Sequence, residues 1–232
     1  MKKNIIISIL FILVCCSYLL MLFKSDVFIA ITKEDSFVEN LGAAFYFIAS
    51  LFFFYNYITS KGSGNNLWKL RTEQNMFCVL LGSAFFCALG EEISWGQRIF
   101  GWGTPEPLCE ANWQEETNIH NINFFMKSGL SFERLFNLFW MTYCLLIPLL
   151  NKYSVSSAKF FKSINLPIAP FWIGFLLLTN YIIIHIIQYF HIYSINRIFY
   201  GALEIKETNY AFIFMALSAY WMIVKPFGTK TD

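Results

Sequence analysis

Long apolar stretches alternate with short polar connections along the whole chain. A helix that crosses a bilayer needs about 20 mostly apolar residues, and an open sheet edge is not tolerated in hydrocarbon. Each stretch approaches that length, so the pattern predicts an all-α integral membrane protein with a single transmembrane domain over residues 1–232. The six expected transmembrane helices are Ile5–Phe23, Leu41–Ile58, Met76–Trp102, Phe132–Leu150, Ile168–Phe190 and Ala202–Val224.

The charged residues in the connections predict the orientation of the chain. With the N-terminus in the cytoplasm, a modest majority of the 17 Lys and Arg residues fall in cytoplasmic segments, as the positive-inside rule requires. Both termini are then cytoplasmic. The 15 Asp and Glu residues are more skewed, because only Glu73 and Asp232 fall inside. Acidic residues contribute little to topology, so this skew indicates chemistry or ion binding at the outer face.

The composition supports a membrane protein and excludes several partners. Hydrophobic residues make up 57% of the chain and charged residues only 14%, whereas soluble domains carry about 25% charged residues. The net charge of +2 and the absence of a basic run argue against a nucleic-acid partner, which leaves membrane lipid as the expected partner. The six Cys residues form no CxxC pair, so neither a disulfide framework nor a thiolate zinc site is indicated.

The segment Gly90–Trp102, GEEISWGQRIFGW, places charge inside an apolar stretch. Glu91 lies roughly 22 Å along a helix that begins at Met76, which is within the outer third of a membrane core about 30 Å thick. In a continuous helix Glu91, Ser94, Trp95 and Arg98 share one face, with Glu92 beside it. We expect Glu91 or Glu92 to act as a general base. The polar side chains that would bind substrate are Ser94, Gln97 and Arg98.

The alternative for this segment is an internal ion pair with Arg98 or a snorkelling boundary. Intramembrane ionisable residues mark functional sites by default, and the concentration of polar residues here favours function.

Two further segments carry His residues. In NWQEETNIHN, Glu116 and His120 have the i, i+4 spacing of a metal-ligand pair or an acid–base pair, although a capped polar loop explains the same letters. In the fifth predicted helix, His185 lies on a polar stripe at about the depth of Glu91. A hydrogen-bonded core His is the alternative there. His120 and His185 are therefore candidate acids or metal ligands.

Near the start of the last predicted helix, Glu204 and Glu207 lie on one face at i, i+3, where acids also favour the helix dipole. Arg197 is a candidate for binding an anionic headgroup. Carboxylates and imidazoles at one level suit a divalent metal such as zinc. The candidate metal ligands are Glu116, His120, His185, Glu204 and Glu207.

The residues GEEISWGQRIFGW followed by NWQEETNIHN, within Gly90–Asn121, resemble the signature of a family of uncharacterised bacterial multi-pass membrane proteins. The resemblance implies a location in the bacterial cytoplasmic membrane and no mechanism. A weaker similarity is to the CPBP intramembrane proteases, whose motifs are EExxxR, FxxxH and HxxxN. Here Arg98 lies beyond the first motif, Tyr181 precedes His185 in place of Phe, and Asn196 follows His191 one residue late. That family serves as an analogy for how paired Glu and His activate water in a membrane.

Three functions remain open. The first is an intramembrane enzyme, a hydrolase or transferase open to the extracytoplasmic side and acting on a lipid, a lipid-linked group or a membrane peptide. The second is a small transporter or proton-coupled carrier, although no inverted repeat is visible. The third is a non-catalytic assembly factor whose polar groups pack helices together.

Overall fold

The computed structural model describes residues 2–33, 35–60, 74–112, 117–119, 122–123, 131–190 and 196–224, excepting a few side chains, and most of these residues are helical. Asn112 and Ile122 form an isolated β-bridge, and no strand is described within these ranges. The all-α prediction is confirmed. The longer helices are α1 (Lys2–Ser17) with its 3₁₀ continuation η1 (Tyr18–Leu22), α3 (Phe37–Thr59), α4 (Met76–Glu92), α8 (Phe132–Met141), α11 (Phe171–Tyr189) and α12 (Asn196–Val224). The shorter helices are α2 (Ser25–Thr32), η2 (Ser94–Gly96), α5 (Gln97–Phe100), α6 (Glu106–Ala111), the π-turn η3 (Thr142–Leu146), α9 (Ile147–Tyr153) and α10 (Val155–Ser163).

Four described segments are long and apolar enough to cross a membrane: Asn4–Leu22, Ser25–Thr59, Phe132–Tyr153 and Phe171–Tyr189. Large apolar side chains stay exposed on these segments, including Ile12 at 58%, Leu138 at 64% and Phe175 at 54%. Surface of this kind is stable against lipid and costly against water. A helical structure with such apolar segments is compatible with a membrane protein.

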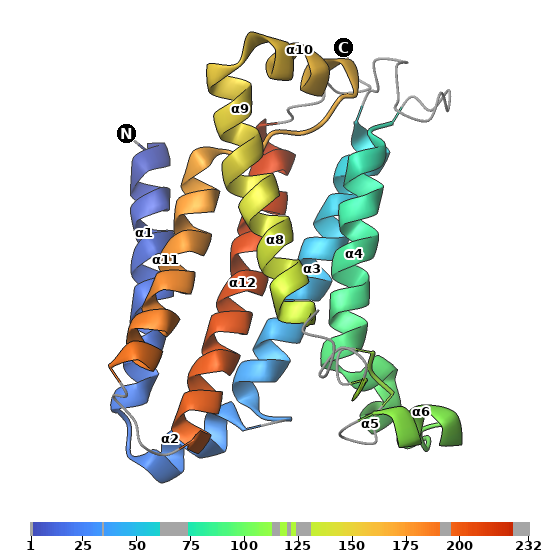
Figure 1. The fold of residues 1–232 in the computed structure, drawn as a ribbon, viewed down its shortest axis with the longest axis vertical. Helices are drawn as coiled ribbons and strands as arrows, with labels where there is room; N and C mark the ends of the chain where they lie inside the picture. The colour runs from blue at the N-terminus through green and yellow to red at the C-terminus, as the bar shows by residue number, and fades with distance from the viewer. Residues whose placement is uncertain are drawn as a thin grey trace.

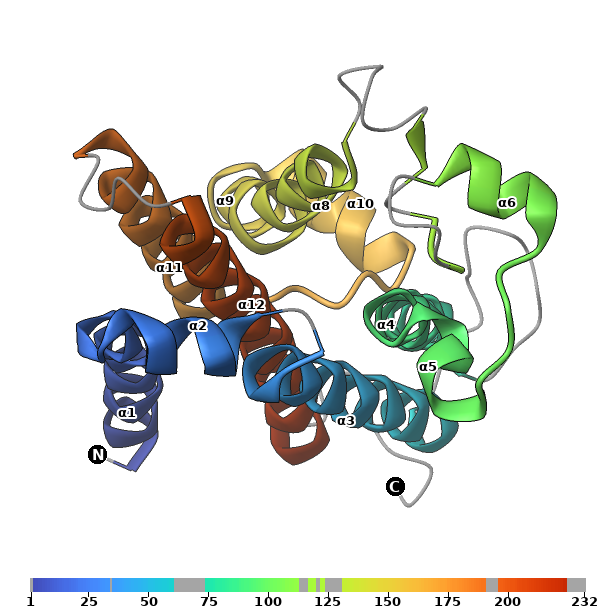
Figure 2. The same cartoon turned by 90° about the horizontal axis from the view of Figure 1, so that it is seen from below.

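The helices form one bundle (Figures 1 and 2). Its two ends differ in charge. Helix α1 begins and α12 ends at the same end of the bundle, the upper one in Figure 1, and α10 lies across that end. We call it the basic end, after Lys152, Lys159 and Lys162. Helices α2, α5 and α6 lie at the opposite end. We call that the acidic end, after Glu39, Glu91, Glu92, Glu133, Glu204 and Glu207.

The third predicted helix, Met76–Trp102, is wrong in its second half. Helix α4 stops at Glu92, and the backbone then turns through three left-handed residues, Ser94 (φ 46°), Trp95 (φ 54°) and Gly96 (φ 82°). The indole of Trp95 folds back over Gly90, where a Cβ atom would lie only 2.9 Å from the ring. The close contact between the Trp95 ring and the backbone of Gly90 requires a glycine at position 90. The chain changes direction after α4 at these left-handed residues.

An aromatic stack joins α3, α4 and α12 in the middle of the bundle. Phe85 stacks on Phe53 with ring centroids 5.5 Å apart and contacts Phe214 at 4.7 Å. Trp221 closes the stack edge-on against Phe53. Aromatic pairs at these spacings add about 0.5–1.5 kcal/mol each beyond the area they bury. The stack fixes α12 against the α3–α4 pair, and this packing sets the positions of the acidic residues at one end.

Glycines permit the closest approaches between helices. A Cβ atom on Gly174 of α11 would lie 2.3 Å from the backbone oxygen of Cys144 in η3. A Cβ atom on Gly201 of α12 would lie 2.3 Å from Thr32 Oγ1 at the end of α2. Small residues at helix crossings are typical of membrane bundles, where close packing replaces the hydrophobic effect as the driving force.

Candidate functional site

The acidic end gathers carboxylates from four separate helices. Glu39 and Glu133 lie in the first turns of α3 and α8, where the helix dipole favours a negative charge. Glu91 and Glu92 lie in the last turn of α4, where the dipole opposes one. Both therefore reduce the stability of α4 unless other contacts compensate. Glu204 and Glu207 complete the cluster from α12.

Glu92 is the central member of the cluster. Its side chain is half-buried, and the carboxylate is repelled most strongly by Glu207, then by Glu204, Glu39 and Glu91. Among the described residues it has no hydrogen-bond donor and no cationic partner. It borders a cavity of about 70 Å³ lined by Asp35, Glu39, Asn40, Ala43, Glu92, Ile93 and Ile99. Carboxylates held together at low dielectric need a compensating proton or cation.

Lys206 is a buried positive charge at this end, and it is paired with carboxylates other than Glu92. It is only 1% exposed. Its Nζ atom lies 2.6 Å from a carboxylate oxygen of Glu133 and 3.6 Å from one of Glu207. The pair with Glu133 ties α12 to α8. The sequence pattern did not identify Lys206, Glu133 and Glu39 as members of the site. Lys206 could have been recognised because it lies between Glu204 and Glu207 in an otherwise apolar helix.

Glu91 has a different environment from Glu92. One carboxylate oxygen accepts a hydrogen bond from the indole Nε1 of Trp95 at 2.7 Å, and the other accepts one from the backbone N–H of Ile119 at 2.7 Å. Glu91 therefore holds the reversed chain after α4 and the segment 117–119 together. Its role in this structure is that of an organiser of the loop.

Gln97 makes the same kind of connection. Its side-chain amide donates to Thr104 Oγ1 at 2.8 Å, and its carbonyl oxygen accepts from the backbone N–H of Thr117 at 2.7 Å. Ser94 is buried at the left-handed turn. These residues shape the chain that follows α4. Because α4 ends at Glu92, the single helix face expected for Glu91, Ser94, Trp95 and Arg98 does not form, and the side chain of Arg98 lies outside the described residues.

The structure does not bring His185 to the carboxylate cluster. His185 is exposed on α11, its Nδ1 atom lies 2.8 Å from the backbone oxygen of Tyr181, and its ring lies 4.0 Å from the Tyr181 ring. Helices α11 and α4 lie on opposite sides of α12 in both views (Figures 1 and 2). Arg197 is exposed near the start of α12.

Glu116 and His120 lie outside the described residues. Within the part of the chain that the structure does describe, no group of three or more His, Cys, Asp and Glu side chains is placed to hold a metal ion. Of the five candidate metal ligands, Glu204 and Glu207 share the acidic end, and His185 lies apart from them. The described geometry supports a carboxylate site.

A polar network lies deeper in the bundle, next to the acidic end. Asn180 of α11 is fully buried; its Oδ1 atom accepts from Tyr18 Oη at 2.8 Å and from Asn209 Nδ2 at 2.9 Å. Its amide donates to the backbone oxygen of Lys206 at 2.9 Å. Asn209 Nδ2 also donates to Ser17 Oγ at 2.9 Å. The network joins η1, α11 and α12.

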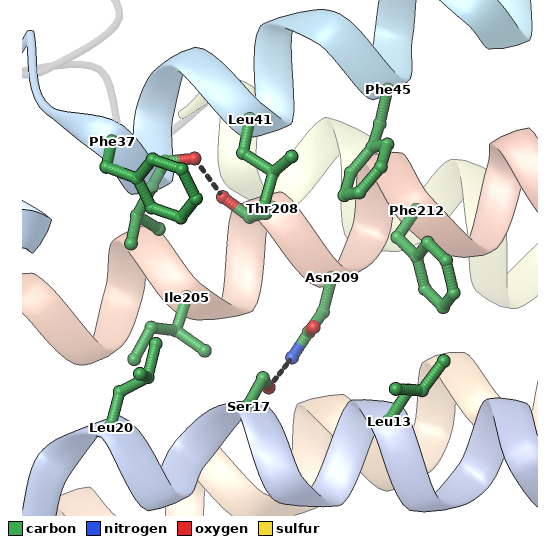
Figure 3. Close-up of a pocket in the computed structure, with 11 residues that line it drawn as sticks. Leu13, Ser17, Leu20, Phe37, Leu41, Phe45, Ile205, Thr208, Asn209 and Phe212 are labelled. Carbon is green, nitrogen blue, oxygen red and sulfur yellow. Dashed lines mark hydrogen bonds between the residues drawn. The ribbon is translucent and has the colours of Figure 1, made fainter.

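An apolar groove opens between α1, α3 and α12 (Figure 3). Its volume is about 290 Å³, close to the lower limit of about 300 Å³ for small-molecule pockets. Most of the lining is Leu, Ile and Phe, and the polar groups present are bonded within the protein: Thr208 Oγ1 donates to Val38 O, and Ser17 Oγ donates to Val14 O. The groove therefore offers a hydrocarbon surface at the depth of the spans.

Comparison of the chain with protein-family models, curated proteins and solved structures finds no match. The class of protein is thus defined by the fold, a helical bundle with segments able to cross a membrane. Functional inference rests on the geometry of the acidic end.

Proposed function

We propose that the chain crosses a bacterial cytoplasmic membrane six times, with the basic end in the cytoplasm and the acidic end on the outer side. The helical segments alternate in direction between the two ends, which supports this arrangement (Figure 1). Helix α4 has 17 residues and α12 has 29, so both are close to or above the length that a span requires. Lys152, Lys159 and Lys162 then lie on the side that the positive-inside rule favours.

We propose further that the acidic end is the site of an intramembrane hydrolase or transferase. The observation that carries this is Glu92, a half-buried carboxylate among four others, beside a cavity and without a described cation. A carboxylate in such surroundings can take up a proton and return it, which is the property that a general acid–base catalyst needs. Glu92 is thus the catalytic residue of the proposal, with Glu207 as a second carboxylate.

The chemistry that fits is hydrolysis or group transfer. Glu92 takes the proton of a water or hydroxyl group. The oxygen of that water or hydroxyl group forms a bond to the substrate's carbonyl or phosphoryl centre at the same time. The protonated Glu92 then gives that proton to the leaving oxygen or nitrogen. The substrate is membrane-embedded: a lipid, a lipid-linked group or a membrane peptide. The groove of Figure 3 provides hydrocarbon surface for its apolar part.

The test compares membranes that contain the wild-type protein, Glu92→Gln or Glu91→Gln at matched levels of inserted protein. Total lipids and membrane peptides are profiled by mass spectrometry. We expect wild type to convert at least one species to a product and Glu92→Gln to abolish that conversion. Glu91→Gln should reduce that conversion only in proportion to the loss of folded protein. The same profile from wild type and Glu92→Gln would overturn the proposal.

A proton-coupled carrier is the second candidate, favoured by the Asn180 network. Buried polar groups continue from Lys206 at the acidic end to Tyr18 and Ser17, and a carrier needs polar groups across the membrane. Proteoliposomes with a pH-sensitive dye inside distinguish the two functions. Proton flux that Asn180→Leu and Glu92→Gln both abolish would establish the carrier, and its absence would remove this option.

A further inference from the structure

Helix α10 is oriented differently from the helices around it. One residue, Ser154, separates the span Phe132–Tyr153 from α10. The backbone bends there, and Ser154 Oγ caps the new helix by accepting from Ser157 N at 3.2 Å. Figure 1 shows α10 lying across the basic end of the bundle, whereas the long helices that reach this end run along the axis of the bundle. Its position next to the end of a span places it at the level of the lipid headgroups.

The exposed face of α10 carries both positive charge and apolar groups. At 100° per residue, Val155, Lys159, Phe160 and Lys162 fall on one broad arc. All four are exposed, Val155 at 73% and Phe160 at 54%. The opposite side of the helix carries Phe161, which is only 8% exposed. A mixed basic and apolar face is the pattern of helices that lie in the membrane interface.

The surroundings of α10 reinforce its positive charge. No Asp or Glu occurs between Ile147 and Asn165. Lys152, just before α10, is also exposed, and its Nζ atom lies 5.0 Å from the ring centre of Tyr153 and 5.8 Å from that of Phe171. Lysine and aromatic side chains together are typical of the membrane–water boundary. The local charge is complementary to a phosphate-bearing lipid surface.

We propose that α10, with Lys152, Lys159 and Lys162, is an anchor that binds the headgroups of anionic phospholipids in the leaflet at the basic end. The apolar side chains Val155 and Phe160 enter the boundary between headgroups and acyl chains, and the lysines contact lipid phosphates. The inference is independent of the reaction proposed for the acidic end. It requires only that the neighbouring span lies in a membrane.

The experiment uses the full chain in nanodiscs of phosphatidylcholine alone or with added phosphatidylglycerol, and it measures amide hydrogen exchange in a peptide covering α10. A Lys near an anionic surface contributes roughly fivefold to binding, so two lysines contribute about 25-fold. We expect phosphatidylglycerol to slow exchange in α10, and we expect high salt to weaken that protection because it screens the exposed charges. Lys159→Gln with Lys162→Gln should remove the protection.

A matched double variant at the other end, Lys24→Gln with Lys33→Gln, should leave the protection of α10 unchanged. Inorganic phosphate added to phosphatidylcholine nanodiscs separates a free phosphate ligand from a lipid. Equal exchange in the two lipid compositions, protection that survives the α10 double variant, or protection by phosphate alone would each overturn the proposal. Protease sensitivity and gel filtration confirm that each variant is folded before exchange is measured.

Discussion

Replacement of Asn180 by leucine tests how strongly the buried polar network holds the bundle together. The substitution conserves volume closely and removes three hydrogen bonds, from Tyr18 Oη, from Asn209 Nδ2 and to Lys206 O. Hydrogen bonds between helices in membrane proteins contribute about 0.6 kcal/mol on average and up to about 1.7 kcal/mol each. Asn180→Leu should therefore lower the free energy of unfolding by about 2–5 kcal/mol.

The assay is reversible unfolding of purified protein in mixed micelles, followed by circular dichroism as the denaturing detergent is raised. Tyr18→Phe removes only one of the three bonds and should cost about 0.6 kcal/mol. In the Asn180→Leu background Tyr18→Phe should cost almost nothing, because its acceptor is already gone. Thr59→Val is the control, since Thr59 is bonded to the preceding turn of its own helix. An Asn180→Leu variant as stable as wild type, or a full additive cost for Tyr18→Phe in the Asn180→Leu background, would show that these hydrogen bonds do not hold the bundle together.

Two further predictions concern packing and charge. Gly174→Ala should cost about 1–3 kcal/mol of stability, because the new Cβ meets the rigid backbone of Cys144, whereas Gly103→Ala has open space and should be neutral in the same unfolding assay. Glu133→Gln should lower the free energy of unfolding by about 1–2 kcal/mol, because it leaves the buried charge of Lys206 without this partner. The loss is smaller than for a fully buried pair because the Glu133 side chain is 54% exposed. Lys206→Met should cost less, because it leaves only an exposed carboxylate without its partner. A larger loss for Lys206→Met than for Glu133→Gln would contradict this prediction.

The helices were predictable because a chain in hydrocarbon must satisfy every backbone hydrogen bond within itself. Apolar stretches of sufficient length therefore identify helices without further information. The end of α4 was not predictable, because Ile93, Trp95 and Ile99 continue the apolar pattern beyond Glu92. A local contact, the Trp95 ring over Gly90, lies at the point where the helix stops, and the apolar pattern does not reveal it.

The sequence predicts how deep each candidate site residue lies along its helix. It does not predict which way the side chain faces or where the helix lies within the bundle. Distance along a helix placed Glu91, Glu92, Glu204 and Glu207 near one end of the bundle, and the structure brings Glu92 together with both α12 carboxylates. The same estimate gave His185 a matching depth, yet His185 lies on α11 away from them, because depth carries no information about lateral position. The different environments of Glu91 and Glu92 depend on the loop after α4, which the sequence pattern does not specify.

Glu92 is assigned to function and Glu91 to structure, and the unfolding stabilities of Glu92→Gln and Glu91→Gln distinguish these two roles. Glu91→Gln weakens the charge-assisted hydrogen bonds from Trp95 and Ile119 and should lower the free energy of unfolding by about 1–2 kcal/mol. Glu92→Gln removes a charge that its neighbours and the α4 dipole oppose, so stability should stay unchanged or rise. A loss for Glu92→Gln as large as that for Glu91→Gln would contradict the account.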